Sequence, residues 1–375
     1  MRVALVHDYL NQYGGAERVL EALHELYPDA PVYTSIYDPA SMPAHFKSWD
    51  IRTSFLQRIP LARQLHRSFL LLYPTAFESF DLHGYDVVIS NSSAWSKFAI
   101  TPPETLHVCY CLTPMRWAWN YEEYVEREQL GGIVRRVLPF AVHYLRKRDT
   151  ATASRVDRFI GISRAVVARI AKYYGREADL IAPPVDTQSV PVGDGPGDSY
   201  LVASRLVPYK RIDLAVVACS RLGVPLTVVG DGRDRSRLEA LAGPTVRFVG
   251  RLPDRGVYET MARSRAFLFP GEEDFGIAPV EAMAAGRPVI AYAAGGALDT
   301  VIDGVTGCLF SPQTVEALAD RLRAFNPDDF EPSAIRQHAM RFDTRVFQES
   351  FAAYVKRSRD ERAAQPVAPW EPASV

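Results

Sequence analysis

Short apolar runs alternate with longer segments of helical periodicity along most of this 375-residue sequence. Strands that alternate with helices of this length predict parallel sheets with right-handed crossovers, and therefore an α/β fold of doubly wound, Rossmann-like sheets. We expect strands at residues 3–6, 32–35, 87–90, 107–111, 158–161, 200–203, 226–229, 247–249, 266–269, 289–291 and 307–310. We expect helices at residues 16–26, 61–72, 134–153, 164–174, 212–222, 233–242, 254–263, 278–285, 314–325 and 342–361.

The length of the chain suits two domains, each large enough to bury its own core. Both halves open with a strand, a loop and a helix, so we predict two doubly wound domains that face each other. The N-terminal domain is expected over residues 1–184 and the second over 185–341, with proline- and glycine-rich segments at the boundary. A C-terminal helix over 342–362 should pack back on the N-terminal domain, and a disordered tail should follow over 363–375.

The composition argues against several functional classes. The formal net charge is −1, so no global charge indicates a nucleic-acid partner. No apolar run reaches the roughly 20 residues that a membrane span needs, and the first strand lacks the features of a signal peptide. The four cysteines lack zinc-ligand spacing, and Cys109 and Cys111 are interpreted as buried thiols. A cytoplasmic location is therefore expected.

The segment 270–283, with sequence PGEEDFGIAPVEAM, carries the strongest functional signal. It follows an expected strand, and it places Glu273 in the strand-end loop and Glu281 in the first turn of the next helix. Ligands of open α/β sheets bind at that edge, and the free N–H groups of Gly276–Ala278 suit an anion. Because carboxylates repel phosphate, the two acids are interpreted as acceptors for hydroxyl groups. A ligand with phosphate and many hydroxyls is a sugar nucleotide.

Other strand-end loops of the second half could complete such a site. Arg205 and Lys210 could neutralise a diphosphate, although ordinary solvated charges are an equal alternative. Glycines in Gly230–Gly232 would let a ligand approach the backbone, and the loop at Gly250 and Arg251 could read a base edge. A Gly-Asp-Gly sequence by itself is usually just a turn, and a plain turn explains the second loop at least as well as base recognition does.

Taken in order, these motifs resemble retaining glycosyltransferases of family 4, which have the two-domain glycosyltransferase B fold. The similar segments in the second half are 204–213, 230–232, 248–250 and 273–290. The resemblance extends to the first half through 14–18, 155–163 and 183–186, and it covers nearly everything except the C-terminal tail. The segments 8–10, 14–20 and 113–116 are similar to bacterial mannosyltransferases that use GDP-mannose in surface-polysaccharide assembly. UDP-glucose or a similar UDP-hexose is the alternative donor.

The resemblance implies a role for individual residues. Arg205 and Lys210 would hold the donor diphosphate and stabilise the departing nucleotide, and Glu273 would accept hydrogen bonds from the donor sugar. Glu281 would bind the ribose. The remaining donor-binding positions are Gly14, Gly15, Ser204, Gly230, Asp231, Gly250, Arg251, Phe275, Gly276, Ile277 and Ala278. A hexose would move to an acceptor hydroxyl with retention of configuration, without a metal or another cofactor.

On the acceptor side the resemblance points to the loop after residue 111 and to the end of the first strand. The expected acceptor-binding residues are His7, Asp8, Thr113, Arg116 and Trp117. His7 and Asp8 could equally serve to shape their loop, and the tryptophans could pack beneath a loop instead of stacking on sugars. Leu112 occupies a position where similar proteins often carry a histidine, and His107, inside a strand, is no obvious substitute. Weakened activity, an altered substrate or a backbone group in that role would each fit.

Two basic and apolar segments, 52–72 and 135–148, could lie on an anionic membrane surface or could be solvated helix faces. The acceptor is expected to be a lipid-linked molecule or an oligosaccharide. Two other functional classes stay open: a nucleotide-sugar epimerase on the same fold, and a catalytically silent binding protein.

Overall fold

The computed structural model describes residues 1–60, 69–119 and 132–364. The side chains of Trp117 and of residues 132–137 also lie outside the description. The helix expected over 61–72 therefore falls largely outside the described residues, as do most of the tail expected over 363–375 and the side chains of Arg135 and Arg136.

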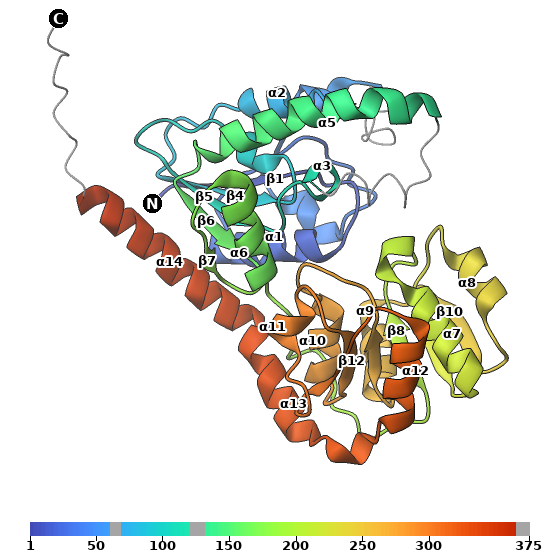
Figure 1. Ribbon diagram of the computed structural model, residues 1–375. Coiled ribbons are helices and arrows are strands. Elements are labelled where there is room, and N and C mark those ends of the chain that lie inside the picture. The colour runs from blue at the N-terminus through green and yellow to red at the C-terminus, as the bar shows by residue number, and fades with distance from the viewer. Residues whose placement is uncertain (61–68, 120–131, 365–375) are drawn as a thin grey trace, which may run out of the picture. The chain divides into compact units, whose positions relative to one another are not determined.

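The first sheet has seven strands in the order β3-β2-β1-β4-β5-β6-β7 (Figure 1). The strands are β1 (Val3–His7), β2 (Val32–Thr34), β3 (Ile51–Thr53), β4 (Val87–Ser92), β5 (Leu106–Cys111), β6 (Arg158–Gly161) and β7 (Asp179–Leu180). β1 pairs in parallel with both β2 and β4, and all three are buried along their full length. Continuous apolar runs give buried parallel strands because helices cover both faces.

The helices that accompany this sheet follow the expected periodicity. They are α1 (Gly15–Leu26), α2 (Tyr73–Glu78), α3 (Arg116–Trp119), α5 (Gly132–Ala153), α6 (Arg164–Tyr174) and α14 (Thr344–Ala364), with short 3-10 turns η1 (Ala44–Ser48), η2 (Phe55–Arg58) and η4 (Ser96–Phe98). α1 buries Val19, Leu20 and Leu23, which lie on one face. α6 begins where the Ser163 hydroxyl accepts from the backbone N–H of Val166, and it ends at Gly175 in the left-handed conformation.

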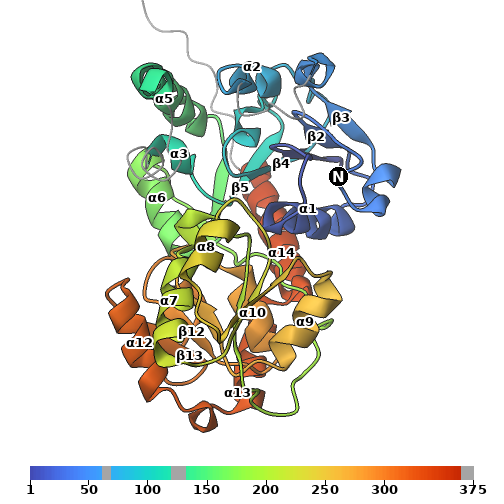
Figure 2. The same cartoon turned by 90° about the vertical axis from the view of Figure 1, so that its right-hand side faces the viewer.

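The last helix, α14, lies beside α1, although more than 300 residues separate them in sequence (Figures 1 and 2). The Gln348 amide donates to the Ala22 carbonyl at 3.1 Å and to Glu25 at 3.0 Å. Phe351 packs edge-on against Tyr110 of β5, with ring centroids 5.8 Å apart. α14 therefore helps to close the core of the first sheet.

The second sheet has six strands in the order β10-β9-β8-β11-β12-β13, and every pair is parallel. The strands are β8 (Tyr200–Ala203), β9 (Leu226–Val229), β10 (Val246–Gly250), β11 (Phe267–Phe269), β12 (Val289–Tyr292) and β13 (Gly307–Phe310). The helices are α7 (Ile212–Leu222), α8 (Arg235–Leu241), α9 (Asp254–Ala262), α10 (Ile277–Ala284), α11 (Ala297–Thr300), α12 (Val315–Ala324) and α13 (Pro332–Ala339), with 3-10 turns η5 (Pro208–Lys210), η6 (Pro327–Asp329) and η7 (Met340–Phe342). Figure 2 shows α7 and α12 on one face of this sheet and α9 and α10 on the other.

Contacts divide the chain into two compact units. One unit comprises Met1–Cys111, Lys147–Ile160 and Gln348–Val375, and the other comprises Leu112–Arg146 and Gly161–Phe347. In each sheet the strand order reverses beside the first strand, between β1 and β4 and between β8 and β11. We call these two places the first and second reversal points. The carboxyl ends of the strands at a reversal point are where open α/β sheets bind ligands.

Candidate functional site

On the β8 side of the second reversal point, hydrogen bonds join the loops that follow β8, β9 and β10. The backbone N–H of Ser204 donates to the Val229 carbonyl, and that of Leu206 donates to the Asp231 carbonyl, each at 3.0 Å. The N–H of Gly230 donates to the Gly250 carbonyl at 2.8 Å. Four predicted donor-binding residues, at the ends of three neighbouring strands, therefore belong to loops that are tied together through the backbone.

Two glycines make this close approach possible. A Cβ atom on Gly230 would lie 1.8 Å from the Ser204 carbonyl oxygen, and the φ of Gly230 is 127°. A Cβ on Gly232 would lie 2.2 Å from the Leu206 carbonyl oxygen. No other residue fits either position without moving the neighbouring loop, so the Gly230–Gly232 turn has a packing role whatever it binds.

Lys210 and Glu273, two of the residues predicted to be catalytic, form an ion pair at this reversal point. Their side chains are 14% and 21% exposed, so solvent reaches both. The Lys210 ammonium also lies 5.3 Å from the centre of the Tyr209 ring. Arg205 is exposed, and its Nη2 donates to the Tyr209 hydroxyl at 3.5 Å. The two cations thus share Tyr209 as a neighbour.

The loop after β11 is held in place by glycines to which the sequence pattern assigned no individual role. A Cβ on Gly271 would lie 2.7 Å from the Lys210 carbonyl oxygen. The N–H of Gly296 donates to the Glu273 carbonyl at 2.8 Å, and a Cβ on Gly295 would lie 2.2 Å from that same oxygen. The backbone of Glu273 is therefore fixed while its carboxylate stays accessible.

Helix α10 begins at Ile277, directly after Gly276 in the left-handed region with φ of 91°. The first N–H groups of a helix, here those of Ile277 and Ala278, have no partner within the helix, and they mark its positive end. Glu281 falls in the second turn, not the first as expected, because the helix starts one residue earlier. It is buried, and it accepts a hydrogen bond from the Tyr258 hydroxyl at 3.3 Å.

The other donor-binding predictions occupy varied places in the second unit. Phe275 is buried and packs edge-on against Phe342, with centroids 5.6 Å apart. The Asp231 carboxylate accepts from the N–H of Gly232 at 2.8 Å. Arg251 is exposed. Of these three residues, Arg251 is the one that carries an exposed charged side chain.

Three predicted acceptor residues lie in the loop after β5 and in the short helix α3 that follows it. The Thr113 hydroxyl donates to the Pro114 carbonyl at 3.1 Å, and the side chain of Trp117 lies outside the described residues. Arg116 donates to Asp274 at 3.1 Å within the same compact unit. Although burial opposes its charge, Asp274 and Tyr209 raise the pKa of Arg116 above its ordinary value.

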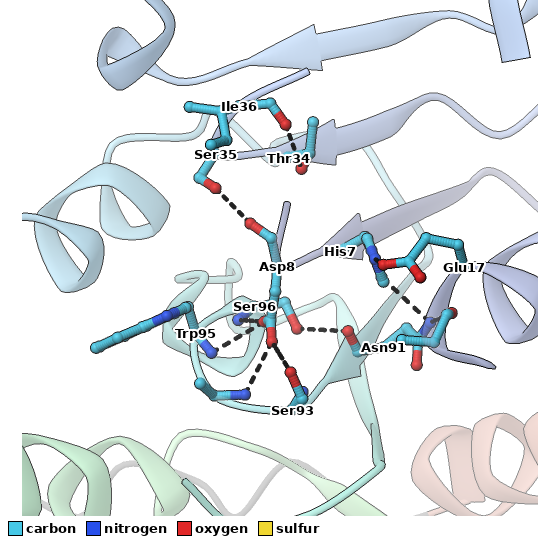
Figure 3. A network of polar contacts seen from close by, with 12 residues as sticks. His7, Asp8, Glu17, Thr34, Ser35, Ile36, Asn91, Ser93, Trp95 and Ser96 are labelled. Atoms are coloured by element: carbon cyan, nitrogen blue, oxygen red, sulfur yellow. Dashed lines mark hydrogen bonds and ion pairs between the residues drawn. The ribbon is translucent and has the colours of Figure 1, made fainter. Parts of the chain in front are cut away.

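The first reversal point carries His7 and Asp8 at the end of β1 (Figure 3). Asp8 is buried, and its carboxylate accepts five hydrogen bonds, from the backbone N–H groups of residues 93–96 and from the Ser93 hydroxyl, at 2.6–2.9 Å. Such saturation explains how a buried carboxylate is tolerated there. Gly14 and Gly15 stand at the start of α1, two residues before the buried Glu17 that contacts His7.

His107 lies inside β5, fully buried, with its Nε2 2.9 Å from the Ser90 hydroxyl. Burial lowers the pKa of His107 to about 4, although Asp157 opposes this shift. The imidazole is therefore neutral at physiological pH.

The described residues contain no group of three or more His, Cys, Asp or Glu side chains arranged to hold a metal ion. Of the helices in the described ranges, none has the length and apolar character to cross a bilayer. The roles assigned to the individual site residues and the absence of a cofactor stay predictions.

Known proteins resemble this chain in sequence and in fold. A GDP-mannose-dependent alpha-mannosyltransferase from Mycolicibacterium smegmatis is 33% identical over 168 residues, which cover 42% of this chain and 44% of that protein. The chain spans about half the length of the curated relatives it matches. Sucrose-phosphate synthase from Thermosynechococcus elongatus superposes with a TM-score of 0.76 at 20% identity, covering 97% of this chain and 100% of that one. Anabaena HepE in complex with UDP-glucose gives 0.70 at 21% identity, covering 95% and 100%.

These structural likenesses confirm the predicted fold class, a glycosyltransferase B type with two Rossmann-like α/β domains. Residues 194–341 match the family of glycosyl transferases group 1, and this segment contains the second reversal point.

Proposed function

We propose that this protein is a retaining glycosyltransferase of family 4 that transfers a hexose from a nucleotide diphosphate sugar to an acceptor hydroxyl, without a metal. The observation that best supports this proposal is the accessible Lys210–Glu273 ion pair at the second reversal point. The pair lies inside the segment that matches the family of glycosyl transferases group 1. The acceptor is a lipid-linked molecule or an oligosaccharide.

The ion pair suggests which part of the substrate each residue binds: Lys210 the diphosphate and Glu273 the sugar. A diphosphate competes with Glu273 for Lys210, because it offers the lysine a stronger anionic partner. The carboxylate that Lys210 releases can accept hydrogen bonds from sugar hydroxyls. Arg205 and the start of α10 add positive potential where charge develops on the leaving diphosphate, which is the main source of rate acceleration in such a reaction.

GDP-mannose is the favoured donor, because the M. smegmatis relative is named for that dependence. UDP-hexose is the alternative, since Anabaena HepE, with the same fold, binds UDP-glucose. These relatives thus support a nucleotide sugar more firmly than they support either guanine or uracil as its base.

A cytoplasmic location with peripheral contact to an anionic membrane completes the proposal. On α5, Phe140 is 79% exposed, and Tyr144 and Lys147 follow it at helical spacing on the same exposed face. An exposed aromatic face with a cation suits a lipid surface. Sedimentation with anionic vesicles, compared with neutral ones, checks this part of the proposal.

The activity is tested with purified protein, GDP-mannose or UDP-glucose, and a membrane lipid extract that is added or withheld. Lipid-dependent release of nucleotide with a glycosylated product supports transfer. A changed sugar without an acceptor would identify an epimerase. Donor binding without turnover would identify a silent binding protein.

In that assay we expect Lys210→Ala to lower kcat/KM by about 10²–10³-fold, as the loss of one stabilising group at a developing charge does. The melting temperature should stay nearly constant, because partly exposed ion pairs add only about 0–1 kcal/mol. Arg221→Ala is the matched control, since Arg221 pairs with Glu316 on the exposed surface of the same unit at 3.0 Å. Near-normal turnover by Lys210→Ala would contradict the assignment.

A further inference from the structure

A buried polar network joins the ends of β1 and β4 to the start of α1 (Figure 3). His7 and Glu17 are each 2% exposed, and Asn91 is 1% exposed. The Asn91 Nδ2 lies 3.2 Å from the His7 Nδ1, and the His7 Nε2 lies 3.4 Å from the Glu17 Oε1. These three side chains belong to three different elements, so the network ties those elements together.

The hydrogen bonds define which nitrogen of His7 carries the proton. The Asn91 Nδ2 also donates to the Ala16 carbonyl at 2.8 Å, which fixes the orientation of the amide. An amide nitrogen only donates, so the His7 Nδ1 must accept its second N–H. The proton of the neutral imidazole therefore resides on Nε2, and it points at the Glu17 carboxylate.

The network holds the backbone immediately after the glycine pair. Ala16 and Glu17 follow Gly14 and Gly15 directly, and both are bound from the strand side. The second carboxylate oxygen of Glu17 lies 3.5 Å from the place where a Cβ on Gly14 would stand. Two consecutive glycines are otherwise the least constrained part of a chain. The network thus supplies the order that the glycine pair lacks by itself.

Asp8, the residue after His7, orders the turn that follows β4 through hydrogen bonds of its own. Asp8 follows His7, and its five accepted hydrogen bonds fix the turn over residues 93–96. Both loops of the first reversal point are therefore set before any substrate arrives, which lowers the ordering cost of binding.

We propose that Asn91, His7 and Glu17 are positioning residues that hold the Gly14–Gly15 loop in the shape that receives the phosphate portion of the nucleotide sugar. None of them needs to touch the substrate, since Asn91 acts through His7 and Ala16, and His7 acts through Glu17. This role rests on the proposed function, because it assumes a nucleotide-sugar substrate.

The test measures kcat and KM for whichever nucleotide sugar turns over. Asn91→Leu removes both N–H donors at similar volume, and we expect it to raise the KM for the donor about tenfold with little change in kcat, since a misplaced binding loop weakens productive binding. Glu17→Leu should do the same. Glu17→Gln should stay within about twofold of wild type, because an amide oxygen still accepts from His7.

Two further measurements separate positioning from general damage. His107→Gln alters the other buried histidine of the same sheet, and it should lower thermal stability without changing the KM for the donor. In ¹⁵N spectra of the wild type, the His7 Nδ1 should be unprotonated and Nε2 protonated, and Asn91→Asp should place a proton on Nδ1.

Each outcome decides between the two proposals. An unchanged KM in folded Asn91→Leu, or a wild-type proton on the His7 Nδ1, would overturn the positioning role while leaving the transferase intact. Absence of wild-type turnover with every nucleotide sugar would overturn the proposed function, and the positioning role would fall with it.

Discussion

The two reversal points occupy equivalent places in their sheets, but the charged side chains are buried at the first and accessible to solvent at the second. At the first, Asp8 and Glu17 are buried, and the hydrogen bonds of Asp8 are all made within the protein. At the second, Lys210 and Glu273 pair with each other while solvent reaches both side chains, and Arg205 is exposed. Both sheets have the same topology at their reversal points, but of these charged residues, those at the second are the ones that solvent reaches.

Burial explains the difference in use. A buried charge needs saturated hydrogen bonding, and a group bound in that way cannot change partners without a large cost. Accessible ions in a pair exchange partners cheaply, because water screens the intermediate state. We therefore interpret the buried charges of the first reversal point as a rigid support for its loops, and the accessible charges of the second as groups that can exchange their partner for an anion. Variants at either point can break this comparison.

The largest effect on the free energy of unfolding is expected at a buried ion pair that contacts the residues bound to Asp8. Lys97, 1% exposed, pairs with Asp149 of α5 and donates to the Ala94 carbonyl at 2.9 Å, and Ala94 is one of the residues bound to Asp8. Lys97→Met removes the cation that balances Asp149, so we expect a loss of about 3–5 kcal/mol in urea unfolding.

The double variant Lys97→Met/Asp149→Leu is the control for this prediction. Replacing both partners by apolar groups should restore much of the stability, since no uncompensated charge remains. A single variant as stable as the wild type would show that this region tolerates charge without support, and the contrast between the two reversal points would weaken.

A smaller effect is expected from Asp8→Asn. The amide keeps the shape of the carboxylate but turns one acceptor into a donor that faces backbone N–H groups. We expect unfolding to cost about 2–3 kcal/mol less, as for the loss of hydrogen bonds to a charged group, with the KM for the acceptor unchanged. A stable variant with weakened acceptor binding would instead favour the acceptor-binding role predicted for Asp8 and would place the acceptor at the first reversal point.

Most elements of the fold could be predicted from apolar periodicity, because strands such as β8, β11 and β12 are uninterrupted apolar runs. Strands β3 and β7 could not be predicted in this way. β3 is half-exposed, and β7 has two exposed residues, so neither carries an apolar signal. Helix α13 was missed as well, since it follows a segment rich in proline and aspartate that is typical of a loop.

For the candidate site, the sequence predicts which residues are candidates, but it does not predict which of them contact each other. Motif order identified Lys210 and Glu273, whereas their contact depends on β8 and β11 being neighbours, which is a property of the whole sheet. The need for glycine at Gly271 and Gly295 arises from carbonyl groups far away in sequence. The saturation of Asp8 depends in the same way on a turn that lies 85 residues further along.

The smallest effect expected is a pH dependence of stability from His107, in the interior of the first sheet. Its pKa is lowered to about 4 by burial, from an ordinary value of 6.5. Between these values the unfolded chain binds a proton that the folded chain does not, so stability must fall as the pH falls. From pH 7 to pH 5 the loss should be about 2 kcal/mol. His107→Gln, which can still bond to the Ser90 hydroxyl, should remove this part of the slope in urea unfolding. If the slope is the same in both proteins, the imidazole takes up its proton in the folded state. Solvent would then reach the interior of this sheet, which would contradict the interpretation of the first reversal point as a rigid, buried support.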